Sequence, residues 1–270
     1  MTPDHTKNMT NAPESGTGTL GKAMAVLDIV VSSAAPMRFT DILDVAGQPR
    51  GTLHRQLSHL VEEGLLSLRA DLTYEPGLRL LKFAARAWAG NEFRAIATPY
   101  LKTLHEETGE TVHLGVLRGT EVVYLDKVES RQTVRMQSQI GNASPVYCTG
   151  LGKAALSALP RETLKEVVDG LVFRGFTQNT HRDAASLLAD LDEARRLGYA
   201  FDREEHEAEI RCVAAAIPAG GFTGGVSVTG PAYRVTMEQL EGWGPSVRRI
   251  AAAIRDEAAL KLGPGRVGLP

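Results

Sequence analysis

The sequence predicts an α+β protein made of two folded parts joined by a helical connector. Three observations lead to this prediction. Apolar residues recur at helical spacing from Leu20 to Val61, a short β-like hairpin follows, and strand-like and helical runs are mixed after Thr111. This order is typical of a small, mainly helical domain followed by an antiparallel sheet covered by helices.

Length and composition set the broad class of protein. The chain has 270 residues, of which 43% are hydrophobic and 23% charged, and this length accommodates two domains. Residues 1–18 are rich in Thr, Asn, Pro, Ser and Gly and are expected to form a disordered tail. No apolar run approaches the length of a membrane span, and the N-terminus lacks the apolar core of a signal peptide. We therefore expect a cytoplasmic protein with no membrane partner.

The stretch from Gln48 to Leu66 is predicted to form a helix with two contrasting faces. One face carries an apolar stripe made of Leu53, Leu57, Leu60 and Val61. The other face carries side chains that donate hydrogen bonds, namely Arg50, Thr52, His54, Arg55, Ser58 and His59. Gly64 is expected to end the helix in the left-handed conformation. Such a polar face suits the major groove of DNA, although an ordinary amphipathic surface helix has the same pattern.

The segments around this helix favour the DNA interpretation. Two helical runs precede it, at Leu20–Val31 and Asp41–Ala46, and β-like runs at Leu65–Arg69 and Leu72–Glu75 follow it. Three helices and a small hairpin in this order make a winged helix-turn-helix, with the hairpin as the wing. We expect this domain to cover residues 19–83, with a small α+β interaction domain as the alternative.

Charge in the predicted head is balanced. From Leu20 to Phe83 the chain has seven Lys or Arg and seven Asp or Glu, and the whole chain has a formal net charge of −2. Bulk charge therefore gives no affinity for DNA. Affinity would depend on local placement of Arg50, Arg55 and Arg69, doubled by dimerisation.

Residues 84–108 are predicted to form a linker helix. Apolar residues continue at helical spacing through this stretch, while Asn91 and Pro99 interrupt or kink it and Gly109 ends it. Apolar side chains on a connector indicate contact with a partner, so we expect the helix to help dimerise the heads. Packing on its own domain is the alternative, and the two are compatible.

Residues 109–270 are predicted to form the second domain, an antiparallel sheet covered by helices. Strands are expected at Thr111–Leu117, Glu121–Lys127, Val134–Gln139, Ser144–Cys148, Tyr199–Asp202, Cys212–Ile217 and Gly224–Thr229. Helices are expected at Ala154–Leu159, Arg161–Leu171, Asp183–Leu197 and Thr236–Leu262.

Few residues of this second domain suggest chemistry by themselves. The run Gly150-Leu151-Gly152-Lys153 lacks the spacing of a P-loop, and indicates a tight strand-to-helix turn that tolerates an anion. Cys148 and Cys212 form no metal or disulfide motif, and no histidine is tied to Cys148 by sequence. His105-Glu106-Glu107 lacks the second histidine of a zinc motif, and His206 lies in an acidic run. We expect no metal, no cofactor and no enzymatic activity.

Three segments together resemble the IclR family of bacterial transcriptional regulators. They read PVYCTGLGKAAL from Pro145, GYAFDREEHE with RCVAAAIP from Gly198, and VSVTGPAYRVT from Val226. The resemblance runs from Leu20 to about Leu262. It implies a winged-helix head, a profilin- or GAF-like α/β effector domain, and a homodimer or dimer of dimers on operator DNA. It also implies that a small organic acid controls operator binding.

The resemblance also implies site residues. The effector would be bound by Met136, Gly150, Leu151, Asp202, Ile210, Cys212, Ser227 and Thr229. The DNA contacts expected from the helix and the wing are Arg50, Gly51, Thr52, His54, Arg55, Ser58 and Arg69. Three positions depart from the family pattern, namely Gly51, Gly150 and Glu209. The alternative function is a small-molecule sensor or an enzyme of the GAF-like domain, with Cys148 or Cys212 reactive.

Overall fold

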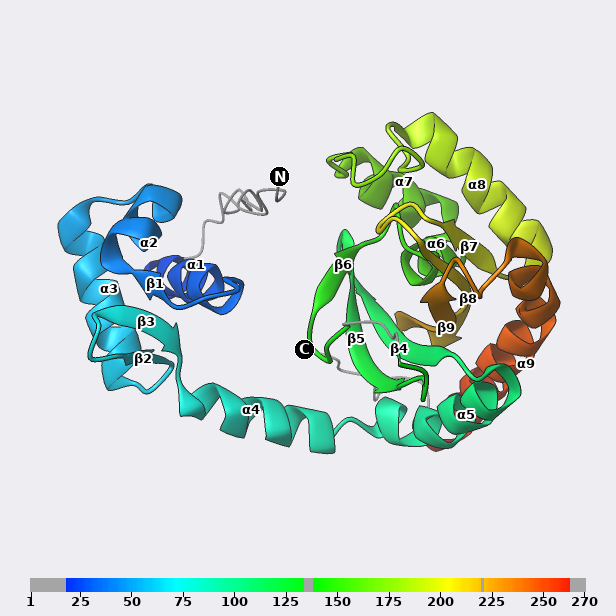
Figure 1. Cartoon of the computed structure of the whole chain (residues 1–270), viewed down its shortest axis with the longest axis horizontal. Helices are drawn as coiled ribbons and strands as arrows, with labels where there is room; N and C mark the ends of the chain where they lie inside the picture. Colours follow the sequence, from blue (N-terminus) through cyan, green and yellow to red (C-terminus); the bar gives the residue numbers. More distant parts are fainter. Residues whose placement is uncertain (1–17, 134–137, 220, 263–270) are drawn as a thin grey trace. The chain divides into compact units, whose positions relative to one another are not determined.

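The computed structural model describes residues 18–133, 138–219 and 221–262, and these form two compact units that divide between Gly90 and Asn91. The predicted tail falls on residues 1–17, which lie outside the described residues apart from Gly18. Figure 1 shows each unit with its elements labelled.

The N-terminal unit is a winged helix-turn-helix. Its helices are α1 (Thr19–Val31), α2 (Phe39–Ala46), α3 (Arg50–Glu62) and α4 (Leu78–Ala89), and its strands are β1 (Met37–Arg38), β2 (Leu66–Leu68) and β3 (Thr73–Pro76). The strands form an antiparallel sheet in the order β1-β3-β2. Strand β1 was not predicted, because two residues are too short for a readable alternation. Gly47 and Gly64 have φ of 59° and 69°, which turn the chain out of α2 and α3.

The core of this unit confirms the apolar stripe of α3. Leu53, Leu57 and Leu60 are buried against side chains of α1, α2 and β2, and Val61 is half-buried beside them. Helix α4 differs from the others, because none of its residues is buried within the chain. Leu78 and Leu81 on α4 are 83% and 67% exposed.

The C-terminal unit is built on a six-stranded antiparallel sheet in the order β6-β5-β4-β9-β8-β7. The strands are β4 (Thr111–Arg118), β5 (Glu121–Val128), β6 (Ala143–Pro145), β7 (Ala200–Arg203), β8 (Ile210–Ala219) and β9 (Phe222–Pro231). The helices are α5 (Glu92–Thr108), α6 (Gly150–Ser157), α7 (Arg161–Asp169), α8 (Ala184–Leu197) and α9 (Met237–Leu262). The predicted α+β class, with an antiparallel sheet covered by helices, is confirmed.

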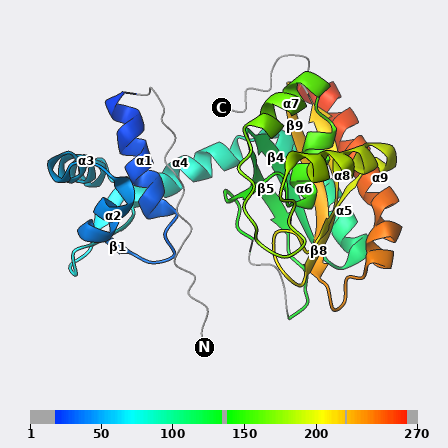
Figure 2. The same cartoon turned by 90° about the horizontal axis from the view of Figure 1, so that it is seen from above.

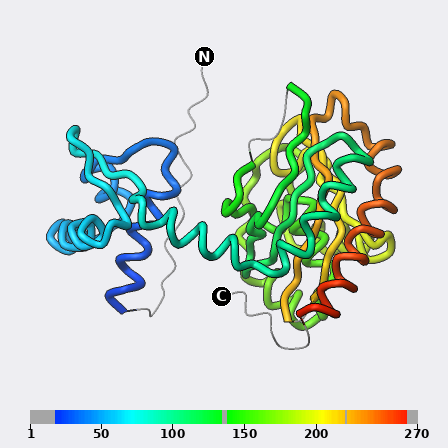
Figure 3. Tube along the Cα trace, turned by 90° about the horizontal axis from the view of Figure 1, so that it is seen from below, coloured from blue at the N-terminus to red at the C-terminus, as the bar shows by residue number. Residues whose placement is uncertain are grey.

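Two apolar layers cover this sheet on opposite faces. Helices α5 and α9 pack on one face, where Leu101 and Ile254 are buried in a common core with the sheet. Helices α6, α7 and α8 cover the other face around Leu156, Leu187 and Leu191. Figures 2 and 3 show α9 alongside α5.

The predicted linker helix over residues 84–108 is not one element. It is split at Gly90 and Asn91, and the Asn91 side chain caps α5 by accepting the backbone N–H of Arg94 at 2.8 Å. Helix α5 belongs to the C-terminal unit, because Phe93, Leu101 and Leu104 are buried in its core. Pro99 lies inside α5 without ending it.

Two other predictions need correction. The expected helix at Ala154 begins at Gly150, because the Thr149 hydroxyl caps it by accepting the N–H of Gly152 at 3.2 Å. The expected strand Ser144–Cys148 is limited to β6, and residues 146–148 form turns instead. The strand expected at Val134–Gln139 falls largely on residues 134–137, outside the described part, and Ser138 and Gln139 are not in a strand.

Candidate functional site

The polar face of α3 is exposed, as a groove-reading helix requires. Arg50, Gly51, His54 and Arg55 are exposed, whereas Thr52 and Ser58 are half-buried. The Arg50 guanidinium lies over the Phe39 ring, 4.9 Å from its centre, which orients the side chain before any partner binds. Four of the six residues predicted to read DNA on this helix are therefore open to a partner, and Thr52 and Ser58 are only partly so.

The wing places Arg69 differently. Its guanidinium Nη1 lies 3.1 Å from a carboxylate oxygen of Glu75, and its Nε lies 4.0 Å from Asp71. Asp71 is held by the N–H and hydroxyl of Thr73, which lower the pKa of that carboxyl. The wing thus carries two acids around its single arginine, and a contact from Arg69 to phosphate would compete with these ion pairs.

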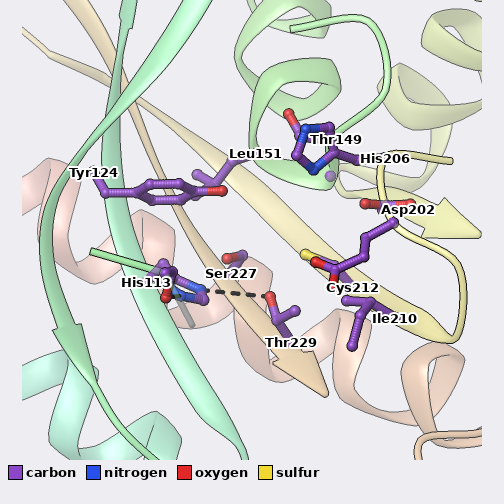
Figure 4. A pocket seen from close by; sticks show the side chains of 13 residues that line it. His113, Tyr124, Thr149, Leu151, Asp202, His206, Ile210, Cys212, Ser227 and Thr229 are labelled. Carbon is purple, nitrogen blue, oxygen red and sulfur yellow. Dashed lines mark hydrogen bonds between the residues drawn. The ribbon is translucent and has the colours of Figure 1, made fainter. Parts of the chain in front are cut away.

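In the C-terminal unit, a cavity of about 40 Å³ lies between the start of α6 and the sheet. We call it the effector cavity. Its lining residues come from β4, β5, α6, β7, β8, β9 and adjoining segments (Figure 4). They are His113, Tyr124, Ser138, Thr149, Gly150, Leu151, Asp202, His206, Glu207, Ile210, Cys212, Ser227 and Thr229.

The cavity brings together seven of the eight residues predicted to bind an effector. These are Gly150, Leu151, Asp202, Ile210, Cys212, Ser227 and Thr229, whereas Met136 lies outside the described residues. The register of the sheet explains the grouping, because Cys212 pairs with Asp202 on one side and with Thr229 on the other. A Cβ built on Gly150 would lie 2.8 Å from the Cys212 Sγ, so glycine permits this close packing.

Six lining residues were not predicted, and His113 is the most informative. It is buried in β4, its Nε2 lies 2.7 Å from the Ser138 hydroxyl, and its Nδ1 lies 3.5 Å from the Thr229 hydroxyl. Burial, with the nearby charge of Lys127, lowers the pKa of His113 to about 4. A histidine inside the apolar run of β4 was the sequence signal that could have indicated it.

Asp202, the buried acid of the cavity, has an unusual environment. Asp202 is 6% exposed, and its Oδ1 accepts the backbone N–H of Glu205 at 2.7 Å. Burial and the negative charge of Glu205 raise the pKa of Asp202 to about 7. Asp202 therefore changes protonation near neutral pH, unlike an ordinary aspartate.

A buried ion pair lies behind the cavity wall. Lys153 Nζ is 2.5 Å from Oδ2 of Asp190 and 2.5 Å and 2.6 Å from the two carboxylate oxygens of Glu205. His181, Asp190 and Glu205 together resemble a donor set for a divalent cation. The ammonium of Lys153 already supplies the positive charge to both carboxylates.

Both cysteines are buried thiols. Burial and the nearby charge of Asp202 raise the pKa of Cys212 to about 12, and burial raises the pKa of Cys148 as well. A thiol that stays protonated at neutral pH is a poor nucleophile. Cys212 therefore packs as a small apolar residue of the cavity wall, and Cys148 packs in the apolar core around α6.

Comparison with known protein families decides what these two units are. A model of the IclR helix-turn-helix domain matches residues 19–69. A model of the C-terminal domain of bacterial IclR transcriptional regulators matches residues 86–256, which is more than half of the chain. The chain belongs to the IclR family.

Individual IclR relatives match over most of their length. The transcriptional repressor AllR of Escherichia coli K12 is 30% identical over 254 residues, which cover 93% of this chain and 94% of AllR. The regulator XynR of the same strain is 32% identical over 197 residues, which cover 73% of this chain and 78% of XynR. The chain is thus an IclR-type transcriptional regulator with a DNA-binding head and an effector-binding C-terminal domain.

Solved IclR structures have the same fold. The IclR of Thermotoga maritima is 31% identical and superposes with a TM-score of 0.67, covering 89% of this chain and 98% of its own. An IclR homologue from Microbacterium hydrocarbonoxydans, solved with 4-hydroxybenzoate, is 22% identical with a TM-score of 0.71, covering 90% of this chain and all of its own. This second likeness concerns the fold alone. Among the described residues, no helix is long and apolar enough to cross a membrane.

Proposed function

We propose that this IclR-type regulator is an operator-binding repressor whose affinity for DNA is set by a small organic acid in the effector cavity. One observation carries the proposal: the same chain has an exposed, donor-rich α3 and, in a separate unit, a cavity walled by backbone amides and hydroxyls. Repression, rather than activation, is supported by the similarity of this chain to AllR, a transcriptional repressor.

The DNA contacts that we propose are those of α3, supplemented by the wing. Arg50, His54 and Arg55 present exposed donors for base edges or phosphates. Thr52 and the N–H at Gly51 would contact the phosphate backbone near the start of the helix, and Ser58 would contact it further along. Arg69 has a smaller role because its charge is compensated by Glu75 and Asp71.

The organic acid is supported by the start of α6. The amides of Gly150 and Leu151 begin the helix, and amides at this position favour an anion. The hydroxyls of Ser227 and Thr229 face the same cavity and can donate further hydrogen bonds (Figure 4). Ile210 and Cys212 give the cavity an apolar side that selects a small carbon skeleton.

A homodimer, or a dimer of dimers, completes the proposal. Helix α4 has no buried residue within the chain, and Leu78, Leu81 and Phe83 on it are exposed. A second copy of α4 would cover these side chains and double the few cationic contacts of a neutral head. The acid would act by binding two quaternary arrangements with different affinity.

We also propose that the protein acts in the cytoplasm and is not an enzyme. The buried, protonated thiols of Cys148 and Cys212 argue against the alternative in which one of them is reactive. No cofactor or metal is needed for the function proposed here.

The test combines a mobility-shift assay with thermal shift. DNA from upstream of the gene should bind, and one or more acids from a panel of small organic acids should raise the melting temperature and change the mobility shift. Ser227→Ala with Thr229→Val should remove the thermal shift, whereas Thr163→Val, on a separate surface groove, should retain it. Full stabilisation of the double variant would move the effector site elsewhere.

A further inference from the structure

Asp202 places a second carboxyl group in the cavity proposed for an anionic effector. It lines the effector cavity on the wall that packs against the start of α6: a Cβ built on Gly150 would lie 3.5 Å from the backbone N of Asp202. Because Gly150, Leu151 and Asp202 line one cavity of about 40 Å³, a carboxylate at the Gly150 and Leu151 amides would share that cavity with the carboxyl of Asp202. Two carboxylates in one buried site cannot both be ionised without a large cost.

The nearest buried cation does not pair with Asp202. The ammonium of Lys153 is bound at 2.5–2.6 Å by Asp190 and by both oxygens of Glu205. Glu205, in turn, uses its backbone N–H for Oδ1 of Asp202. The lysine therefore compensates the two acids behind the wall, and the acid on the wall is left without a direct ionic partner among the described lining residues.

The other groups that face Asp202 supply no positive charge. The described lining includes neither Lys nor Arg, and Glu207 adds a second acid at its exposed edge. Burial lowers the pKa of His206 on the adjoining segment and of His113 on β4, so both are neutral near pH 7. Tyr124 on β5, Cys148 before α6 and Cys212 on β8 hold their protons, because burial raises the pKa of each.

We propose that neutral Asp202 donates its hydroxyl hydrogen to the carboxylate of the effector, so that each anion binds together with one proton. The inference rests on the proposed function, because it requires an anionic effector in this cavity. The proton comes from solvent and is added to the Asp202 carboxylate, and no covalent bond to the effector forms. The two carboxyl groups then share one proton and one negative charge, as in a paired-carboxyl site.

This arrangement makes Asp202 a selectivity residue. It favours an effector that is an anion at the α6 amides over a neutral amide or ester of the same shape, because only the anion accepts the proton of Asp202 in a charge-assisted hydrogen bond. It also makes the response of the regulator depend on pH. The pKa of Asp202 in the folded chain is about 7. Below that pH Asp202 already carries the proton, and above it the proton must be taken from solvent when the effector binds.

The test is titration calorimetry on the full chain, with the small acids lactate and malonate as probes. Proton uptake is measured from the heat in two buffers of different ionisation enthalpy, at about pH 6 and about pH 8. We expect nearly one proton per bound probe at the higher pH and little at the lower. Between about pH 7.5 and 8.5 the affinity should fall about tenfold.

Asp202→Asn is the decisive variant, because the amide keeps an acceptor for the Glu205 N–H and a donor for the probe. It should bind the anions with a pH-independent affinity and take up no proton. His206→Gln, His113→Gln and Glu207→Gln should keep the proton uptake. Melting temperatures of all four variants verify that they are folded.

Three outcomes overturn the inference. Binding without proton uptake at the higher pH is the first. Loss of uptake in a histidine variant, rather than in Asp202→Asn, is the second. The third is that Asp202→Asn binds the probes more weakly while the affinity of the wild-type protein rises with pH. That result would mean that ionised Asp202 accepts a hydrogen bond from the probe. All three leave the organic-acid effector standing, whereas failure of these probes and of the whole panel of small organic acids to bind removes that effector class and this inference with it.

Discussion

The ammonium of Lys153 lies 2.5 Å from Oε1 of Glu205, and the two side chains are 0% and 4% exposed. Lys153 belongs to α6, whose first turn borders the effector cavity, and Glu205 follows β7, whose Asp202 lines the same cavity. Asp190 of α8 shares the same ammonium. The ion pair thus joins the three elements that hold the cavity walls in place.

Replacing Lys153 should be severely destabilising. Lys153→Met leaves Glu205 and Asp190 buried without their common cation, and removing one partner of a buried pair costs about 3–5 kcal/mol. Urea denaturation measures the loss in the free energy of unfolding. Lys165→Met is the matched control, because the pair of Lys165 and Asp169 is exposed, is screened by water and should contribute little. Equal losses in the two variants would contradict a stabilising role for the buried pair.

His113 and Asp202 should give opposite dependences of stability on pH. The folded protein lowers the pKa of His113 to about 4, so the unfolded chain binds more protons between about pH 4 and 6.5, and this contribution is lost as pH falls. The folded protein raises the pKa of Asp202 to about 7, so the folded chain binds more protons between about pH 4 and 7. The contribution of Asp202 to stability is therefore lost as pH rises through this range.

Single variants separate the two contributions. In His113→Asn, the free energy of unfolding should fall by up to about 3 kcal/mol as pH rises from about 4 to 6.5. In Asp202→Asn, it should rise by up to about 3 kcal/mol over the same range. Urea denaturation at closely spaced pH values measures both slopes. Parallel profiles for the two variants would show that neither group titrates as its surroundings indicate.

Gly152 should tolerate no side chain. A Cβ there would lie 2.4 Å from both the Cα and the carbonyl oxygen of Val146, so backbone would have to move. Gly152→Ala should cost more than about 2 kcal/mol in the free energy of unfolding. Gly242→Ala on α9 has open space around its Cβ and should stabilise by about 0.5–1 kcal/mol. Thermal melting distinguishes the two, and a stable Gly152→Ala protein would mean that the start of α6 packs more loosely.

Arg55 and Arg69 should contribute unequally to operator affinity. Arg55→Ala should weaken binding by about 1–3 kcal/mol if the arginine reads a base edge. Arg69→Ala should cost less, because Glu75 and Asp71 already compensate its charge. Arg118→Ala, an exposed arginine of the C-terminal unit, serves as the control. Mobility shifts at low salt measure all three, and an Arg55→Ala protein with unchanged affinity would remove Arg55 from the interface.

The sequence predicted those elements whose pattern is local. The stripe of Leu53, Leu57 and Leu60 fixed the face of α3, and runs of strand-forming residues located the long strands. Helix α6 was placed four residues late, because two glycines within three residues, Gly150 and Gly152, normally disfavour a helix. Here Gly152 is dictated by its contact with Val146, and Thr149 supplies the cap.

The parts of the site that could not be predicted depend on distant pairing. Lys153 and Glu205 are 52 residues apart, and nothing near either of them in the sequence indicates its partner. His113 and Thr229 are 116 residues apart and meet across the pairing of β4 with β9. By contrast, the seven cavity residues suggested by family resemblance lie together, although the binding role of each is still a prediction.

The exposed face of helix α4 bears on how the protein behaves at different protein concentrations. It is 12 residues long and buries none of them within the chain, and an isolated helix of that length has little stability in water. Leu80 packs it on the core of the head, and a cover over Leu78, Leu81 and Phe83 would add to its order. If that cover is a second copy, dilution of the protein loosens the segment next to the wing, and the cellular amount of the regulator becomes an input beside its metabolite.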